Sequence, residues 1–225
     1  MTLAEFTNGL FVGSNPNQIP AESVNQEKIR CFVAIEIPDA VQALLASVQE
    51  ELGKNIRAAS WVKRGNIHLT LKFLGEIASN QINEVKNVME RVASARPPFS
   101  MEIGGIGVFP NLTRPRIIWA GVKTGADEIV AIANAVDIGL SRHGYERDEK
   151  QYRPHLTLAR IKHRINVKPL AQMFRQYDTI LGATVVVNQI RVVQSQLRPS
   201  GAVYTPLETC RFKSRSTTEY NRRRL

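Results

Sequence analysis

This sequence of 225 residues contains few of the residue types that most often mark a reactive site. It has only two cysteines and four histidines, and Cys31 and Cys210 lie far apart without metal-binding or redox spacing. Nothing therefore requires an oxidising compartment, and we expect two buried or unreactive free thiols. No apolar run approaches the ~20 residues of a membrane-spanning helix. Residues 1–28 also lack the basic and apolar segments of a secretory signal, so we expect a cytoplasmic protein that does not associate with membranes.

Acidic residues are outnumbered, with 20 Asp and Glu against 30 Lys and Arg, which gives a formal net charge of +10. An excess of this size favours an acidic partner, such as a nucleic acid or a phosphorylated ligand. Part of the charge lies in residues 213–225, which we expect to form a disordered basic tail. The Asn, Pro, Gly and Ser content of residues 1–28 predicts a flexible leader. We therefore expect one folded domain over residues 29–212.

The apolar patterning predicts a mixture of strands and helices. A β-rich run at 29–37 ends before Pro38, which suits the first turn of a helix that reaches Gly53. Further helices are predicted at 79–95, 126–143 and 167–177, and further strands around 68–71 and at 99–109, 116–122, 152–161, 184–197 and 201–212. Because strands and helices do not alternate strictly, we expect the α+β class with largely antiparallel sheets.

The word HLTL occurs twice, at residues 68–71 and again at residues 155–158. This repetition indicates internal duplication, and a separation of 87 residues is too long for a solenoid repeat but suits two related lobes. We therefore expect a bilobal fold with a pseudo-twofold axis. Its sheets would line a central cleft, with the helices outside.

Each copy of the word pairs an imidazole with a hydroxyl. On an extended strand His68 and Thr70 share one face and the leucines share the other, and the same holds for His155 and Thr157. If the two strands face each other about the pseudo-twofold axis, all four polar groups converge. Two histidines can act as proton donor and proton acceptor, while threonine hydroxyls can bind phosphate oxygens. This set suits in-line attack by water or a hydroxyl on phosphorus.

The histidines and the basic residues near them also allow structural and metal-binding interpretations. A single strand histidine is usually structural, but two copies of the same pair favour catalysis. Zinc needs three or four ligands, and Glu76 follows only the first copy, so we expect no metal and no cofactor. His143 lies at the predicted C-terminal end of a helix, where it would interact favourably with the helix dipole. The basic run of Arg160, Lys162, His163 and Arg164 is either a solvated face or a contact to an RNA backbone.

Four further residues bear on the expected cleft. Lys72 has the strand parity of His68 and is expected to flank the cleft unless a bulge intervenes, whereas Phe73 is expected on the leucine face. Tyr204 and Trp119 are candidates for stacking on a nucleobase, although core packing is the favoured explanation for Trp119.

Four segments together resemble a known family. WVKRGNIHLTLKFLGEI, FSMEIGGIGVFPNLTRPRIIWAGV, YRPHLTLARI and IRVVQSQLRPSGAVYTPL are similar, in order, to the RNA 2′,3′-cyclic phosphodiesterase (2′-5′ RNA ligase-like) branch of the two-histidine phosphoesterase superfamily. The resemblance runs from about residue 29 to residue 212. The leader and the basic tail lie outside it, and Ala159 stands in the second copy where the first has Lys72.

The resemblance implies a metal-independent enzyme that hydrolyses the 2′,3′-cyclic phosphate ends of RNA to a 2′-phosphate. On this basis His68 would be the proton donor, His155 the proton acceptor, and Thr70 and Thr157 the phosphate-binding residues. Symmetry in the sequence does not by itself assign the two histidine roles. The expected partner is an RNA or oligonucleotide with a 2′,3′-cyclic phosphate, and the expected state is a monomer. The reverse reaction, 2′-5′ RNA ligation, and a basic RNA-binding protein without catalysis remain open, as do small cyclic nucleotides as substrates.

Overall fold

A computed structural model describes residues 27–163, 172, 174 and 182–213. The strands are β1 (Lys28–Glu36), β2 (Ala59–Trp61), β3 (His68–Ala78), β4 (Phe99–Phe109), β5 (Ile117–Thr124), β6 (His155–Ile161), β7 (Ala183–Val187), β8 (Gln189–Arg198) and β9 (Gly201–Arg211). The helices are α1 (Asp39–Gly53), the short 3₁₀ helix η1 (Ser79–Gln81), α2 (Ile82–Ser94) and α3 (Ala126–Ser141). Of the helix predicted at 167–177, only residues 172 and 174 are among the described residues, and both are helical. Most of the leader and nearly all of the tail lie outside the described residues.

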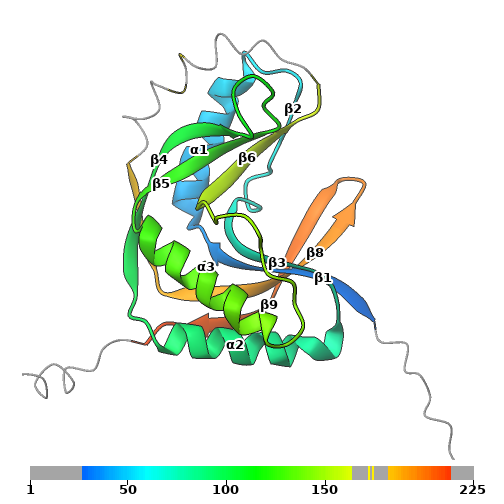
Figure 1. Cartoon of the computed structure of the whole chain (residues 1–225). Helices are drawn as coiled ribbons and strands as arrows, with labels where there is room; N and C mark the ends of the chain where they lie inside the picture. Colours follow the sequence, from blue (N-terminus) through cyan, green and yellow to red (C-terminus); the bar gives the residue numbers. More distant parts are fainter. Residues whose placement is uncertain (1–26, 164–171, 173, 175–181, 214–225) are drawn as a thin grey trace, which may run out of the picture.

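The strands form one curled sheet in the order β7-β4-β5-β6-β3-β1-β8-β9, with β2 paired to β6 (Figure 1). Every strand pairing in this part of the chain is antiparallel. The predicted α+β class with antiparallel sheets is therefore confirmed. None of the helices within the described ranges is both long and apolar enough to cross a membrane.

The strand order shows the expected pseudo-symmetry. β3 and β6, which begin with the two HLTL words, meet in the middle, and each is followed outward by three strands. The two lobes are not the two halves of the sequence, however. The hairpin β8–β9 comes from the end of the described chain, yet it pairs with β1 beside β3. The first lobe therefore contains both early and late segments.

The core lies between the sheet and its helices. α2 buries Val85, Val88, Met89 and Val92, which follow a helical spacing, and it packs against β9, β8 and α3. A single cluster of buried side chains runs through both lobes. Cys31 and Cys210 are buried free thiols, as predicted, and burial raises the pKa of each to about 11.

Both HLTL strands contain a bulge at the same place. Two consecutive residues of β1 pair with Lys72 and Thr70 of β3, so Leu71 has no partner on β1. Two consecutive residues of β5 likewise pair with Ala159 and Thr157 of β6, so Leu158 has no partner on β5. An extra residue in a strand reverses the alternation of side chains beyond it. The second leucine of each word is therefore the point at which the strand changes face.

The first bulge overturns two predictions about the residues after the word. Lys72 does not flank the cleft, because Leu71 and Lys72 are both buried. Phe73 is 63% exposed and lies on the face of His68, since its Cα partner is Phe32, which stacks on that histidine. The prediction for Lys72 carried the condition that no bulge intervenes, and the placement of Phe73 depended on uninterrupted alternation, so the extra residue at Leu71 accounts for both differences.

Candidate active site

The two HLTL words lie side by side at the centre of the sheet. Leu69 and Leu156 are antiparallel partners, and both are fully buried. Extending this register by one residue in each direction sets His68 across from Thr157, and Thr70 across from His155. Because side chains alternate, the leucines face the core and these half-buried polar side chains share the opposite face. The structure therefore brings the four predicted site residues together.

Both imidazole rings are held by the same backbone contact. The Nδ1 of His68 lies 2.8 Å from the carbonyl oxygen of Asn66, and the Nδ1 of His155 lies 2.8 Å from the carbonyl oxygen of Arg153. A carbonyl oxygen only accepts, so each Nδ1–H donates. Each Nε2 is thereby left to take up or release a proton, as acid–base catalysis requires.

Aromatic rings contact each histidine, but in different arrangements. His68 stacks on Phe32 with a centroid distance of 4.5 Å, and the edge of Tyr204 meets it at 5.1 Å. Among the rings that the structure describes, His155 meets only Phe109, in an edge-on contact at 5.0 Å, and Trp119 packs on Phe109 at 5.1 Å. The two sites are therefore related in position but unequal in environment.

Tyr204 and Trp119 are the two residues that the sequence suggested for stacking on a nucleobase. Tyr204 packs on both Phe32 and His68. Trp119 is half-buried, and its Cα partner is Thr157, so it lies on the cleft face rather than in the main core. Its indole Nε1 is buried without a hydrogen-bond partner among the described residues. Trp119 is thus part of the surroundings of His155.

Burial lowers the pKa of both histidines below the ordinary value of imidazole, because removing the charged ring from water disfavours it. The hydrogen bonds to Asn66 and Arg153 act in the opposite direction and only partly offset this effect. Nearby positive charge lowers each pKa further: a charged His155 acts on His68, and Arg160 acts on His155. His155 is therefore close enough to His68 for its charge to lower the pKa of that ring.

Arg160, which the sequence shows only as part of a basic run, lies near enough to His155 to lower its pKa. It follows the bulge in β6 as Phe73 follows the bulge in β3, and its side chain is exposed. The reversal puts it on the face of His155, in agreement with its electrostatic effect on that ring. The duplicated word HLTL was the available signal, since residues at the same offset in both copies are related by the pseudo-symmetry.

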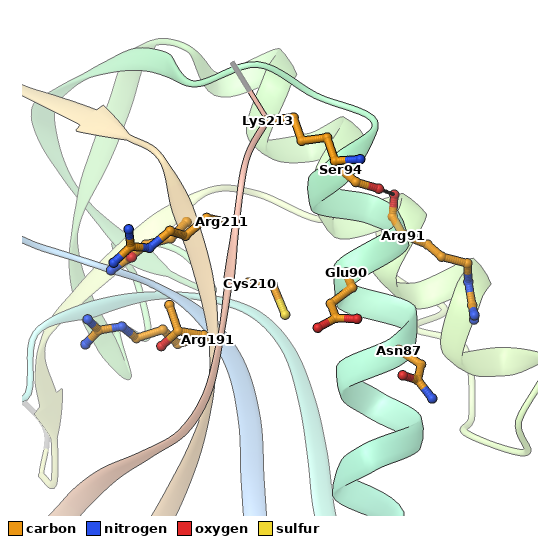
Figure 2. Close-up of a pocket in the computed structure, with 10 residues that line it drawn as sticks. Asn87, Glu90, Arg91, Ser94, Arg191, Cys210, Arg211 and Lys213 are labelled. Carbon is orange, nitrogen blue, oxygen red and sulfur yellow. Dashed lines mark hydrogen bonds between the residues drawn. The ribbon is translucent and has the colours of Figure 1, made fainter. Parts of the chain in front are cut away.

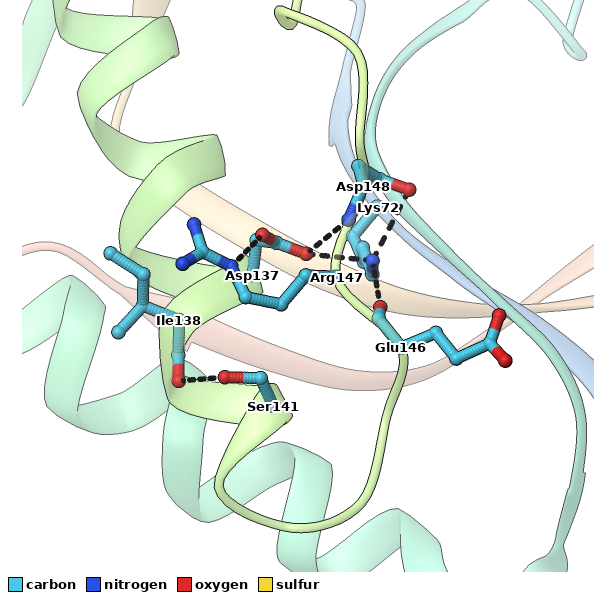
Figure 3. A network of polar contacts seen from close by, with 7 residues as sticks. All are labelled: Lys72, Asp137, Ile138, Ser141, Glu146, Arg147 and Asp148. Carbon is cyan, nitrogen blue, oxygen red and sulfur yellow. Dashed lines mark hydrogen bonds and ion pairs between the residues drawn. The ribbon is translucent and has the colours of Figure 1, made fainter.

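Lys72 belongs to a buried ion-pair network (Figure 3). Its Nζ lies 2.7 Å from Asp137 of α3, 3.2 Å from the Asp148 carboxylate and 2.7 Å from the carbonyl oxygen of Glu146. Arg147 also donates to Asp137, at 3.1 Å. Burial opposes ionisation of Asp137, but the hydrogen bonds from Lys72, Arg147 and the Asp148 N–H outweigh it and lower the pKa of Asp137.

This network fixes the segment that leads into the second histidine. Residues 146–148 are tied to β3 through Lys72. Tyr152 makes a second contact to the same strand, because its hydroxyl donates to the carbonyl oxygen of Thr70, at 2.7 Å. Tyr152 lies three residues before His155. The two histidine strands are thus connected by side chains as well as by the single pair of leucines.

A hollow of about 920 Å³ lies away from this site. It lies between α2 and the strands β8 and β9, and its lining includes Glu90, Arg91, Arg191 and Arg211 but no histidine. Figure 2 shows the side chains of Arg191 and Arg211 on the same side of these strands, away from Glu90. Size alone therefore does not locate the chemistry of this protein.

The remaining histidines lie away from the central words. His143 contacts Glu84, with 2.7 Å between Nδ1 and the carboxylate, and His163 is exposed. Of the basic run, Arg164 lies outside the described residues. No group of three or more His, Cys, Asp or Glu side chains that could hold a metal ion occurs in the part of the chain that the structure describes.

A family model and two proteins of known name match this chain over most of its length. A family model described as LigT like Phosphoesterase matches the chain twice, over residues 35–119 and 121–204, and each match contains one HLTL word. The RNA 2′,3′-cyclic phosphodiesterase of Aquifex aeolicus is 32% identical over 181 residues, which cover 80% of this chain and 95% of that protein. The protein of the same name from Archaeoglobus fulgidus is 32% identical over 179 residues, covering 80% and 98%.

Solved structures show the same fold. A crystal structure from Thermus thermophilus matches with a TM-score of 0.71 at 28% identity, covering 84% of this chain and all of that chain. The crystal structure of Escherichia coli LigT complexed with 3′-AMP matches with a TM-score of 0.67 at 21% identity, again covering 84% and 100%. The double match of the family model agrees with the duplication inferred from the repeated word.

Proposed function

Because this chain belongs to the LigT like Phosphoesterase family, we propose that it hydrolyses the 2′,3′-cyclic phosphate at the end of an RNA to a 2′-phosphate. The observation that carries the proposal is the pairing of Leu69 with Leu156, which brings two imidazole–hydroxyl pairs onto one face. The names of the relatives, RNA 2′,3′-cyclic phosphodiesterase, support the choice of substrate.

The reaction needs one proton acceptor and one proton donor. In the proposed mechanism His155 removes a proton from water through Nε2 while the water oxygen attacks phosphorus. The P–O3′ bond breaks, and O3′ takes a proton from Nε2 of His68. Water thus adds across the bond, the phosphate remains on O2′, and proton exchange with solvent restores both rings. In-line geometry requires the two histidines to act from opposite sides of the phosphate.

The assignment of the two roles is supported by the unequal surroundings of the rings. Arg160 disfavours the charged form of His155, which suits a residue that must begin the reaction neutral. Among the described residues, His155 is the one charged group that lowers the pKa of His68. A neutral His155 leaves His68 free to carry the proton that it donates.

Charge on the phosphate is balanced by donors on the same face. The hydroxyls of Thr70 and Thr157 would each donate to a non-bridging oxygen, and Arg160 would add a positive charge nearby. These groups are fixed by strand geometry before the substrate arrives, so little reorganisation accompanies the reaction. We therefore propose a reaction that proceeds without a metal ion.

A single assay tests this proposal. The full chain is incubated with an oligoribonucleotide that ends in a 2′,3′-cyclic phosphate, in excess chelator, and the position of the product phosphate is read by NMR. We expect a 2′-phosphate, and no product from a variant in which both His68 and His155 are replaced by alanine. A 3′-phosphate product, or loss of turnover on chelation, would contradict the mechanism.

A further inference from the structure

A cavity of about 190 Å³ lies beside His68 and is separate from the second histidine. Its lining includes His68 but neither of the two threonines nor His155. The floor comes from β1, where Phe32, Ala34 and Glu36 point to one face, and Arg191 and Val193 of β8 form one wall. The cavity therefore adjoins only one of the two proposed acid–base groups.

The cavity exists because a small residue stands between larger ones. Ala34 is buried in the middle of the floor, with Phe32 and Glu36 on either side along the same face. Its Cα partner on β8 is Arg191, and the partner of Phe32 is Val193. A single methyl group at this point leaves a recess bounded by longer side chains.

The lining of the cavity combines two kinds of chemistry. Phe32, Val193, Tyr204 and Pro206 form aromatic and apolar walls. Arg191 pairs with Glu36, whose Cα partner on β3 is His68, with 2.6 Å between Nη1 and the carboxylate oxygen. The Nε–H of Arg191 is buried and has no hydrogen-bond partner among the described residues. A buried donor without a partner costs stability, and a bound ligand would satisfy it.

This chemistry suits a flat, uncharged ring with polar edges. Apolar and aromatic walls match the faces of a nucleobase, and an N–H donor beside a carboxylate acceptor matches its hydrogen-bonding edge. A second phosphate is disfavoured there, because the Glu36 carboxylate would repel it. The charge balance thus selects a base over an anion.

The proposed reaction places a base on this side. O3′ departs toward His68, and O3′ belongs to the ribose of the terminal nucleotide, so that nucleoside must lie on the side of the proton donor. We infer that the cavity holds the base of the nucleotide that carries the cyclic phosphate, with the Nε–H of Arg191 and the carboxylate of Glu36 on its edge. This inference rests on the proposed function.

The test compares two substrates that differ only in the base. Uridine 2′,3′-cyclic phosphate and 1-O-methylribose 2′,3′-cyclic phosphate carry the same reacting group, and kcat/KM is measured for both. We expect the native protein to prefer the nucleotide by roughly tenfold or more, as base–aromatic stacking would supply. Ala34→Leu fills the recess and should abolish this preference while leaving the rate on the methylriboside nearly unchanged.

A second variant keeps the inference testable if Ala34→Leu does not fold. Arg191→Lys retains a positive charge beside Glu36 but removes the Nε–H, so it should lower kcat/KM for the nucleotide severalfold and leave the methylriboside unaffected. Equal rates of the native protein on both substrates, or an equal loss on both in the variants, would overturn the inference while the proposed function stands. Turnover of neither substrate nor of a cyclic-phosphate oligonucleotide would instead remove the proposed function.

Discussion

Leu69 of β3 and Leu156 of β6 are direct antiparallel partners, and they are the only residue pair of those two strands that is in register within the described chain. A pseudo-twofold axis through this pair sets each histidine across from the threonine of the other word. The same contact buries two leucines and sets two half-buried imidazoles on the opposite face. Packing and chemistry at the centre of this protein are therefore fixed by one interaction.

Replacement of either central histidine should remove activity without unfolding the protein. His68→Ala and His155→Ala are each expected to lower kcat by about 10²–10⁴-fold, the usual contribution of a general acid or base. The measurement is turnover of a cyclic-phosphate oligonucleotide, with circular dichroism to verify folding. His143→Ala is the matched control, because His143 contacts Glu84 away from the site. Near-normal activity in either central variant would refute the mechanism.

The threonine hydroxyls should matter through hydrogen bonding rather than through shape. Thr70→Val and Thr157→Val keep the β-branched outline and are each expected to lower kcat on the order of 10²-fold, as loss of one charge-stabilising donor does. Serine at the same positions retains a hydroxyl and should restore most of the rate. If valine and serine were equally active, the hydroxyls would have no part in the reaction.

The pH profile of kcat/KM should be bell-shaped and displaced toward acid. Burial lowers the pKa of His68, so the proton donor is lost as pH rises through a value below the ordinary ~6.5. On the acid side activity falls when His155, whose pKa is also lowered, becomes protonated. Arg160→Met removes a nearby charge and should move the acid limb to higher pH. A profile without a decline above pH 7.5 would contradict this assignment.

Removal of Lys72 should destabilise the fold. Lys72→Met leaves Asp137 buried with only Arg147 to balance it, and breaking a buried ion pair in this way costs about 3 kcal/mol or more. The free energy of unfolding in urea at pH 7 is the measurement. The double variant Lys72→Met with Asp137→Leu removes both charges and should recover part of the loss. A single variant as stable as the native protein would show that the network contributes nothing.

A glycine behind the second histidine should be intolerant of even one methyl group. A Cβ at Gly107 would lie 2.2 Å from the Trp119 ring, and that ring packs on Phe109, which contacts His155. Gly107→Ala is therefore expected to cost about 1–3 kcal/mol of stability and to lower turnover.

The control for this substitution is Gly53→Ala, at the end of α1. The added methyl group there would meet Trp61 at an ordinary 3.6 Å, so stability and turnover should remain close to native. Both variants are compared by thermal unfolding and by kcat. Similar behaviour of the two would mean that the Trp119 ring moves freely.

The sequence was sufficient to predict the pairs His68–Thr70 and His155–Thr157, because they depend only on alternation along a strand and on the repeated word. The α+β class followed from the order of apolar runs for the same local reason. Both predictions use periods of a few residues, which a single sequence displays directly.

Two other features could not be predicted in this way. The bulges at Leu71 and Leu158 depend on how β1 and β5 pair with the HLTL strands, and no local pattern records that register. Because of these bulges, Lys72 enters an ion-pair network and Arg160 lies on the face of His155. The return of β8 and β9 to the first lobe is likewise a long-range pairing.

That return has a consequence for synthesis on the ribosome. A growing chain that has emerged only as far as residue 188 already contains both HLTL words, yet the edge of β1 on which β8 pairs remains open, and neither Arg191 nor Tyr204 exists beside His68. Such an edge readily pairs with other chains. The surroundings of His68 and the pairing of β1 are therefore completed together, once residues 189–211 have emerged.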